Sequence, residues 1–149
     1  MLQHGITGAD FRACRELCGW PQEACATDMG VNVHTIKMWE TPKSRWEPRP
    51  EAWAWMDREL QWHESEVARV LDVVDDYRTL NPDMTSATLV LFRPNDGLGR
   101  MRGDSRPSHV HNAIMREVWQ FLNEEGLTTH FVWASQYDAD PEKYKDAIW

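Results

Sequence analysis

A stripe of apolar residues at alternating steps of three and four is the feature that most limits what this chain can fold into. The stripe consists of Trp53, Met56, Leu60, His63, Val67, Val70, Val74 and Tyr77. Such spacing indicates one long helix, expected from about Glu51 to Tyr77, with a face that must be covered along its length. Part of this face must cover the helices that precede it. The rest is available to a second domain or a partner subunit.

Two short helices with their own start and stop signals are predicted at the N-terminal end. Thr7 followed by Asp10 three residues later has the spacing of a capping box, and Gly19 suits the end of this first helix. Pro21 fits the first turn of a second helix, which Gly30 ends. The turns between these helices must therefore be tight.

A third short helix follows at once. Asn32 is a good N-cap, and Ile36 and Trp39, three residues apart, are expected to face the core. The segment 41–50 comes next and carries three prolines, so it is predicted to be an ordered loop.

Glu40, the last residue before this loop, is expected to pair with an arginine of the first helix. The arginines available are Arg12 and Arg15.

The C-terminal half has a strand–helix–strand pattern after a boundary expected at 79–86. A β-rich run at 87–94 is followed by an amphipathic helix at 108–126 and a second strand at 128–134. The segment 141–149 is expected to form a terminal helical turn or short helix. Two strands alone are marginal, which favours completion of this half by a second copy of the chain.

The charge excludes one class of nucleic-acid binder. A net charge of −8 argues against a protein that coats nucleic acid by charge alone, although a specific reader needs only one positive face. The segment 32–49 is a candidate for such a face, because it has four cations and two acids, Glu40 and Glu47. The cations are Lys37, Lys43, Arg45 and Arg49.

The expected compartment is the cytoplasm. No apolar run approaches the roughly 18 residues of a membrane span, and the first residues lack the pattern of a secretory signal.

Three cysteines lie near the N-terminus. Cys14 and Cys18 are one helical turn apart and could present two thiolates to a metal, but no second pair follows at zinc-site spacing. With Cys25 they are better explained as small buried apolar residues that stay reduced. No metal, cofactor or catalytic residue is expected.

The motif that carries the functional expectation is "QEACA" at 22–26 followed by "GVNVHTIKMWE" at 30–40. With its flanks, at residues 7–60, it resembles the Xre/λ-repressor-like helix-turn-helix family, whose pattern has Gln-Glu at the start of helix two and Trp-Glu at the end of helix three. Asn32 replaces the usual serine, and a proline-rich loop replaces the usual glycine-containing one.

This resemblance implies a partner and a set of contacts. The partner is double-stranded operator DNA, with helix three in the major groove and the flanking residues on phosphates. The residues implied to bind DNA are Gln22, Asn32, Val33, His34, Thr35, Lys37, Lys43, Ser44 and Arg45.

The full layout is also similar to the YdiL-like proteins and the related anti-CRISPR-associated repressors, a likeness that includes "FRPNDG" before a helix. The expected fold is mainly α with an α/β C-terminal part. A four- to five-helix, λ-repressor-like helix-turn-helix domain would cover 1–78. A small βαβ-like dimerisation domain would cover 83–149.

The expected function is a homodimeric transcriptional regulator, acting as a repressor or autorepressor on an inverted repeat. Five residues are expected in or next to the interface between the two copies: Val90, Phe92, Val118, Phe121 and Val132.

Three alternatives stay open. The first is an antitoxin that binds DNA and also neutralises a toxin. The second is a small metal-dependent enzyme that assembles His109, His111 and His130, with Asp104, into a site. The third concerns Trp46, Trp53, Trp55 and Trp62, which could stack on bases, although most of them are better explained as core or interface anchors.

A basic loop in the second half is expected to be solvated or to add nucleic-acid contacts. Its arginines are Arg93, Arg100, Arg102 and Arg106.

Overall fold

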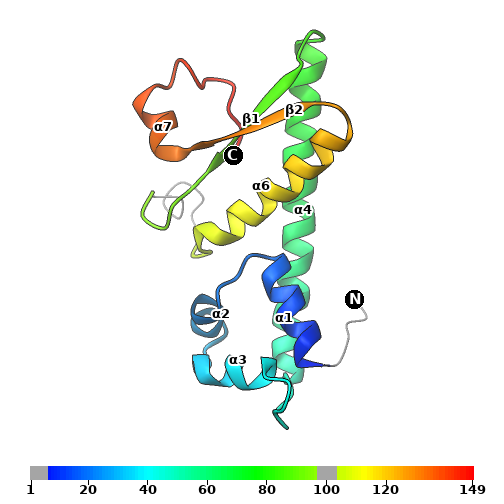
Figure 1. Ribbon diagram of the computed structural model, residues 1–149, viewed down its shortest axis with the longest axis vertical. Coiled ribbons are helices and arrows are strands. Elements are labelled where there is room, and N and C mark those ends of the chain that lie inside the picture. Colours follow the sequence, from blue (N-terminus) through cyan, green and yellow to red (C-terminus); the bar gives the residue numbers. More distant parts are fainter. Residues whose placement is uncertain (1–6, 97–103) are drawn as a thin grey trace. The chain divides into compact units, whose positions relative to one another are not determined.

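The computed structural model describes residues 7–96 and 104–149 (Figure 1). The chain divides into two compact units, Met1–His63 (unit 1) and Glu64–Trp149 (unit 2). The division falls inside helix α4, Pro50–Leu80, upstream of the segment 79–86 where the sequence placed the boundary. The described residues are mainly helical and contain one small sheet, which agrees with the expected mainly α class with an α/β C-terminal part.

Helix α1, Gly8–Leu17, begins with the predicted capping box. The Thr7 hydroxyl accepts a hydrogen bond from the Asp10 amide at 3.2 Å, and the Asp10 carboxylate accepts one from the Thr7 amide at 3.0 Å. Two amides that no helical carbonyl reaches are satisfied in this way. The chain thus specifies the first residue of α1 locally.

Helix α2, Gln22–Met29, begins one residue later than predicted, because Pro21 serves as its extended N-cap. Gly30 ends the helix in the left-handed conformation, at φ 70°, and the amide of Val31 returns to the carbonyl of Ala26 at 2.9 Å. This compact turn leads within three residues into the next helix.

Helix α3, Val33–Glu40, starts at the predicted cap. The Asn32 side-chain oxygen accepts a hydrogen bond from the His34 amide at 2.8 Å. Ile36 and Trp39 are 0% and 5% exposed, so the predicted inner face of α3 is confirmed.

The core of unit 1 forms around Phe11 of α1, which is fully buried. Its ring meets those of Trp39 and Trp53 edge to face, with centroids 5.6 and 5.5 Å apart. Beside this cluster, a Cβ at Gly8 would lie only 1.6 Å from the carbonyl oxygen of Trp39. The first turn of α1 therefore packs directly on the backbone at the end of α3.

The predicted stripe of α4 is confirmed by burial. Its members are all buried or partly buried, whereas Ala54, Arg58 and Gln61 between them are exposed; Trp55 and Glu59 beside the stripe are buried as well, so the covered face is wider there than predicted. The helix is longer than predicted at both ends, Pro50–Leu80.

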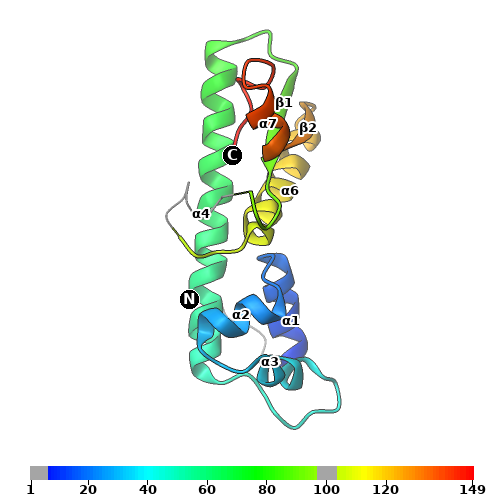
Figure 2. The same ribbon diagram turned by 90° about the vertical axis from the view of Figure 1, so that its left-hand side faces the viewer.

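Unit 2 is built on two parallel strands, β1 (Ser86–Leu91) and β2 (Thr128–Trp133), with Val90 opposite Val132. Helix α6, Ser108–Glu124, connects them and packs against both strands (Figures 1 and 2). This is the expected strand–helix–strand unit. A parallel pair needs such a crossover because its strands run in the same direction.

The C-terminal segment differs from its prediction. Helix α7, Ala134–Ala139, follows β2 directly, and the Gln136 side-chain oxygen accepts a hydrogen bond from the Trp133 amide at 3.0 Å. Of the two options expected at 141–149, the short helix does not form: 141–146 are turns, and Ile148 then bridges Leu89 on the second edge of β1. Backbone pairing with a distant strand decides the structure here.

Four of the five residues expected in or next to a dimer interface lie in the core of one copy. Val90, Phe92 and Val132 form a buried cluster with Ala134, covered by the partly buried Tyr144 and Ala147. Val118 is 0% exposed. The chain's own C-terminal segment and α6 supply the cover that the sequence analysis sought in a second copy.

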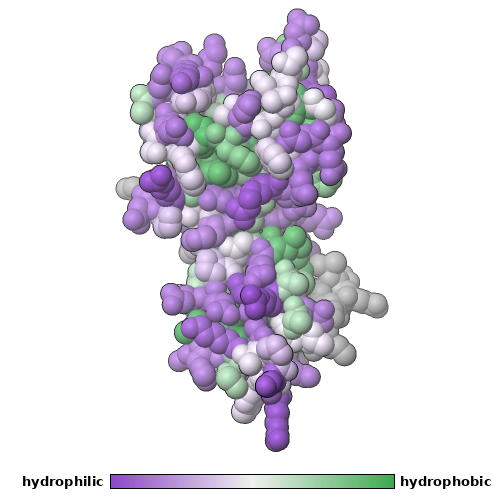
Figure 3. Space-filling model, viewed as in Figure 1, coloured by the Kyte–Doolittle hydropathy of each residue, from purple (hydrophilic) through white to green (hydrophobic). Residues whose placement is uncertain are grey.

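The fifth residue, Phe121, is 44% exposed. Other aromatic side chains of unit 2 are also partly exposed, and Figure 3 shows apolar residues, in green, at its surface beside the strands.

Part of the basic loop, with Arg100 and Arg102, lies outside the described residues. Arg93 stacks over the Trp133 ring at 5.2 Å, and Arg106 pairs with Asp104 at 3.5 Å. Among the described helices, none combines the length and apolar character needed to cross a membrane.

Candidate nucleic-acid interface

A buried ion pair holds α1 and α3 together. Arg15 and Glu40 are 6% and 9% exposed, and the guanidinium binds the carboxylate through two parallel contacts, Nε to Oε1 at 2.6 Å and Nη2 to Oε2 at 2.9 Å. The sequence analysis predicted this pair as one of two options. Two parallel contacts of this kind fix the angle between the guanidinium and the carboxylate as well as the distance between them.

Gln22 extends this contact to α2. Its side-chain amide donates to Glu40 Oε2 at 2.9 Å, and Arg15 Nη1 donates to the Trp20 carbonyl at 2.7 Å. One carboxylate at the end of α3 therefore receives donors from both preceding helices. We call Arg15, Gln22 and Glu40 the clamp.

Two indoles tie the turn between α1 and α2, and α2 itself, to α4. Trp20 donates to Glu59 at 3.0 Å, and Trp55 donates to Asp28 at 2.7 Å. Their rings meet edge to face at 5.2 Å. These contacts complete a rigid support behind α3.

The outward face of α3 is polar. Asn32, His34 and Lys37 are exposed, whereas Val33 and Thr35 are partly buried. Gln22 is also partly buried, because its amide is engaged by the clamp. Five of the predicted DNA-binding residues thus lie on one short helix or its cap, with Ile36 and Trp39 anchoring the opposite side.

The loop 41–49 carries the other three predicted residues and projects beyond the helices of unit 1 (Figures 1 and 2). Lys43 and Arg45 are exposed, and Ser44 is partly buried. The Ser44 hydroxyl accepts a hydrogen bond from the Trp46 amide at 3.0 Å, which gives the loop a defined turn.

A groove of about 290 Å³ lies between this loop and α3. It is lined by His34, Thr35, Met38, Trp39, Trp46 and Arg49. Trp46 is 64% exposed, so it is not part of the core, and its interpretation as an interface anchor stays a prediction. Pro48 is buried, so the end of the loop is held on unit 1 while the Trp46 side chain is left in solvent. Sequence reasoning left Trp46 and Arg49 out of the DNA-binding set, although Arg49 was already counted among the cations.

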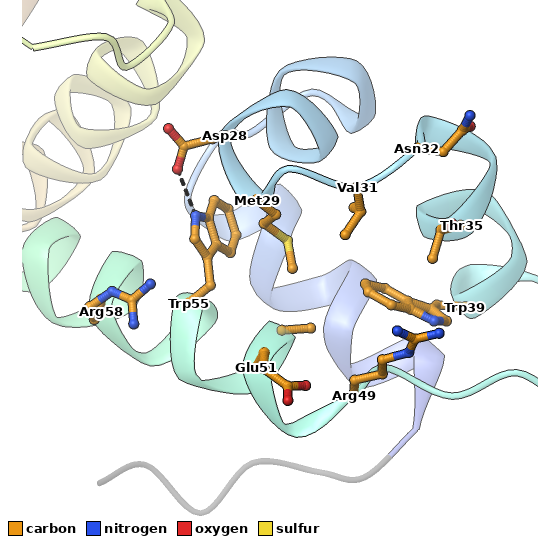
Figure 4. A pocket seen from close by; sticks show the side chains of 11 residues that line it. Asp28, Met29, Val31, Asn32, Thr35, Trp39, Arg49, Glu51, Trp55 and Arg58 are labelled. Carbon is orange, nitrogen blue, oxygen red and sulfur yellow. Dashed lines mark hydrogen bonds between the residues drawn. The ribbon is translucent and has the colours of Figure 1, made fainter.

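A larger groove of about 560 Å³ lies between α2, the start of α3 and the start of α4 (Figure 4). Arg49 lies beside the Trp39 indole, and the hydrogen bond from the Trp55 indole to the Asp28 carboxylate lies at one end of the groove. Both acids and cations line this groove, Asp28 and Glu51 with Arg49 and Arg58. The mixture gives it no clear preference for an anion.

The three cysteines form no disulfide, and burial keeps the thiols of Cys14 and Cys25 protonated. Cys18 and Cys25 are buried, and Cys14 is partly buried. Burial, with smaller contributions from nearby acids, raises the pKa of Cys25 to about 12 and also raises the pKa of Cys14. A raised pKa disfavours the thiolate that metals and electrophiles require.

The histidines of the enzyme alternative are not brought together. His111 is buried and its Nε2 contacts the Val90 carbonyl at 2.9 Å, while His109 and His130 are exposed. Within residues 7–96 and 104–149, no group of three or more His, Cys, Asp or Glu is placed to hold a metal ion.

The comparisons with known proteins add no relative to this description: no protein-family model matches the chain, and no curated protein matches it significantly.

Proposed function

We propose that this protein is a sequence-specific DNA-binding regulator of transcription that reads its operator with α3. Helices α2 and α3 would form a helix-turn-helix, with the start of α3 in the major groove. It would act as a repressor, including of its own gene.

One observation carries the proposal: the clamp and the buried Ile36 and Trp39 fix one side of α3, while the opposite side is polar and exposed. A helix that reads base edges needs both a rigid back and hydrogen-bonding side chains in front.

The distribution of charge supports the same proposal. The one acid within α3, Glu40, is paired with Arg15 and buried, so it does not oppose a phosphate at the outer face of the helix. Lys37, Lys43 and Arg45 are exposed on a chain whose net charge is −8. A local positive surface on an acidic protein favours a specific site over general coating of DNA.

A homodimer is part of the proposal, since one recognition helix reads too few base pairs to select a site in a genome. Two copies related by a two-fold axis would bind an inverted repeat with half-sites roughly 10 bp apart, or a multiple of this. Light scattering on the full chain is expected to give the mass of two copies. A mass of one copy, at a concentration that saturates the DNA, would contradict this assembly.

The function is tested by binding to a duplex that covers the region upstream of the protein's own gene, at fixed salt. Lys37→Ala and His34→Ala are expected to weaken specific binding by about 1–3 kcal/mol each. Lys43→Ala and Arg45→Ala should weaken binding to every sequence and reduce its salt dependence.

Lys145→Ala, which removes an exposed cation of unit 2, is the matched control and should change neither quantity. Unchanged specific affinity for Lys37→Ala would show that α3 does not lie in the groove as proposed.

A further inference from the structure

We propose that the groove between α3 and the loop 41–49 receives one sugar–phosphate strand of DNA, with Trp46 packed on deoxyribose and Arg49 bound to a phosphate. This inference rests on the proposed function and adds two contacts to it. Neither residue belongs to the DNA-binding set that the sequence implied.

The position of the groove carries the first step. His34 and Thr35 of α3 form one wall, and Trp46 and Arg49 belong to the loop and its junction with α4. With His34 facing the base edges in the major groove, Trp46 and Arg49 on the opposite wall would lie next to the sugar–phosphate backbone at the edge of that groove. The occupant that fits this place is the strand itself.

The exposure of Trp46 carries the second step. An indole that is 64% exposed leaves most of its apolar surface in water, and the hydrogen bond between its own amide and Ser44 fixes the loop beneath it. Burial of such a surface on a partner is favourable. The deoxyribose ring is the apolar part of a DNA backbone, and it presents a face of suitable size at every nucleotide.

Charge complementarity carries the third step. Lys43, Arg45 and Arg49 are exposed on this loop, and the described residues offer none of them an ion pair. One acid of the loop, Glu47, is exposed beside Trp46. The cations outnumber it, so the loop as a whole favours a polyanion over an acidic protein surface.

The two contacts differ in physical kind, which makes them separable. A guanidinium on a phosphate releases counterions, so its loss lowers the slope of log K against log salt by about 0.9. An indole packed on sugar releases none, so its loss lowers affinity at every salt concentration and leaves the slope unchanged. Both contacts avoid base edges and therefore act on every sequence alike.

The experiment measures binding of the full-length protein to two duplexes, the region upstream of its own gene and a random sequence of equal length, over a range of salt. Trp46→Ala is expected to weaken both by about tenfold with an unchanged slope, and Trp46→Phe should retain most of the affinity. Arg49→Ala should weaken both and lower the slope by about 0.9.

Two controls match these variants. Leu17→Ala removes another exposed apolar side chain of unit 1, and Arg58→Ala removes a cation that lines the larger groove but not the groove between α3 and the loop 41–49. Both are expected to bind like the wild type.

The outcomes separate this inference from the proposed function. Wild-type affinity for Trp46→Ala and Arg49→Ala, with loss for Lys37→Ala, would overturn the inference and leave the function standing. Loss on the upstream duplex alone would also overturn it, because it would assign Trp46 to a base contact. A wild-type protein that does not distinguish the two duplexes would contradict the function itself.

Discussion

The two units of this protein hold their elements by different kinds of contact. In unit 1, a buried ion pair and two indole–carboxylate hydrogen bonds join the helices. In unit 2, α6 meets the strands through a mostly aliphatic core, with Leu89, Ile114 and Leu122 almost fully buried, and through hydrogen bonds of neutral side chains such as that from Trp119 to the Thr129 carbonyl at 3.1 Å. Polar contacts have direction and apolar contacts have almost none. We infer that unit 1 is built to fix one orientation of α3, and that unit 2 is built mainly for cohesion.

The largest expected effect tests the directional contacts. Glu40→Ala leaves Arg15 buried without its carboxylate, so the free energy of unfolding should fall by about 3–5 kcal/mol in urea titrations. Glu125→Ala is the control: its pair with Arg78 is exposed and makes no contact with the clamp, so the loss should be much smaller. Similar losses for the two variants would remove the distinction drawn here.

A second change tests the apolar unit. Ile114→Ala creates a cavity among residues that are fully buried, so the free energy of unfolding should fall by about 2–5 kcal/mol. Phe121→Ala, on the exposed side of the same helix, should cost much less. Binding to DNA per folded molecule should change little for Ile114→Ala if unit 2 contributes cohesion rather than the orientation of α3.

The smallest expected effect is a fall in the free energy of unfolding at high pH, caused by the buried Cys25 thiol of unit 1. The pKa of the Cys25 thiol is about 12 in the folded chain and near its ordinary value of 9.0 in the unfolded chain. Below pH 9 both states keep the proton. Above it the unfolded chain loses the proton first, so the free energy of unfolding should fall by up to about 1.4 kcal/mol per pH unit. Denaturant titrations at pH 8 and pH 10 should show this fall in the wild type and a smaller one in Cys25→Ala.

Sequence reasoning succeeded where the structure is decided by neighbours in the chain. The capping box at Thr7, the left-handed Gly30 and the Asn32 cap each depend on contacts within a few residues, and all three are confirmed. The stripe of α4 also follows from local spacing.

The sequence did not predict the structure of segments that depend on contacts with residues far away in the chain. The pairing of Ile148 with Leu89 cannot be read from either segment, and α7 was not predicted, because six residues are too few to show a helical period. Apolar patterning marked Val90 and Val132 for burial without saying which surface covers them. In the candidate interface, the exposure of Trp46 could not be predicted, because the loop 41–49 has no periodic pattern that distinguishes an inward from an outward side chain.

The bridge between Leu89 and Ile148 has a consequence for the order of folding. The contacts of the clamp join segments that emerge early during synthesis, whereas β1 gains its second neighbour only when a much later segment is present. Non-local pairing of this kind is slow to form, and exposed strand edges are prone to wrong association while they wait. Unit 1 should therefore reach its native contacts first, and the yield of active protein should depend on how quickly β1 is covered.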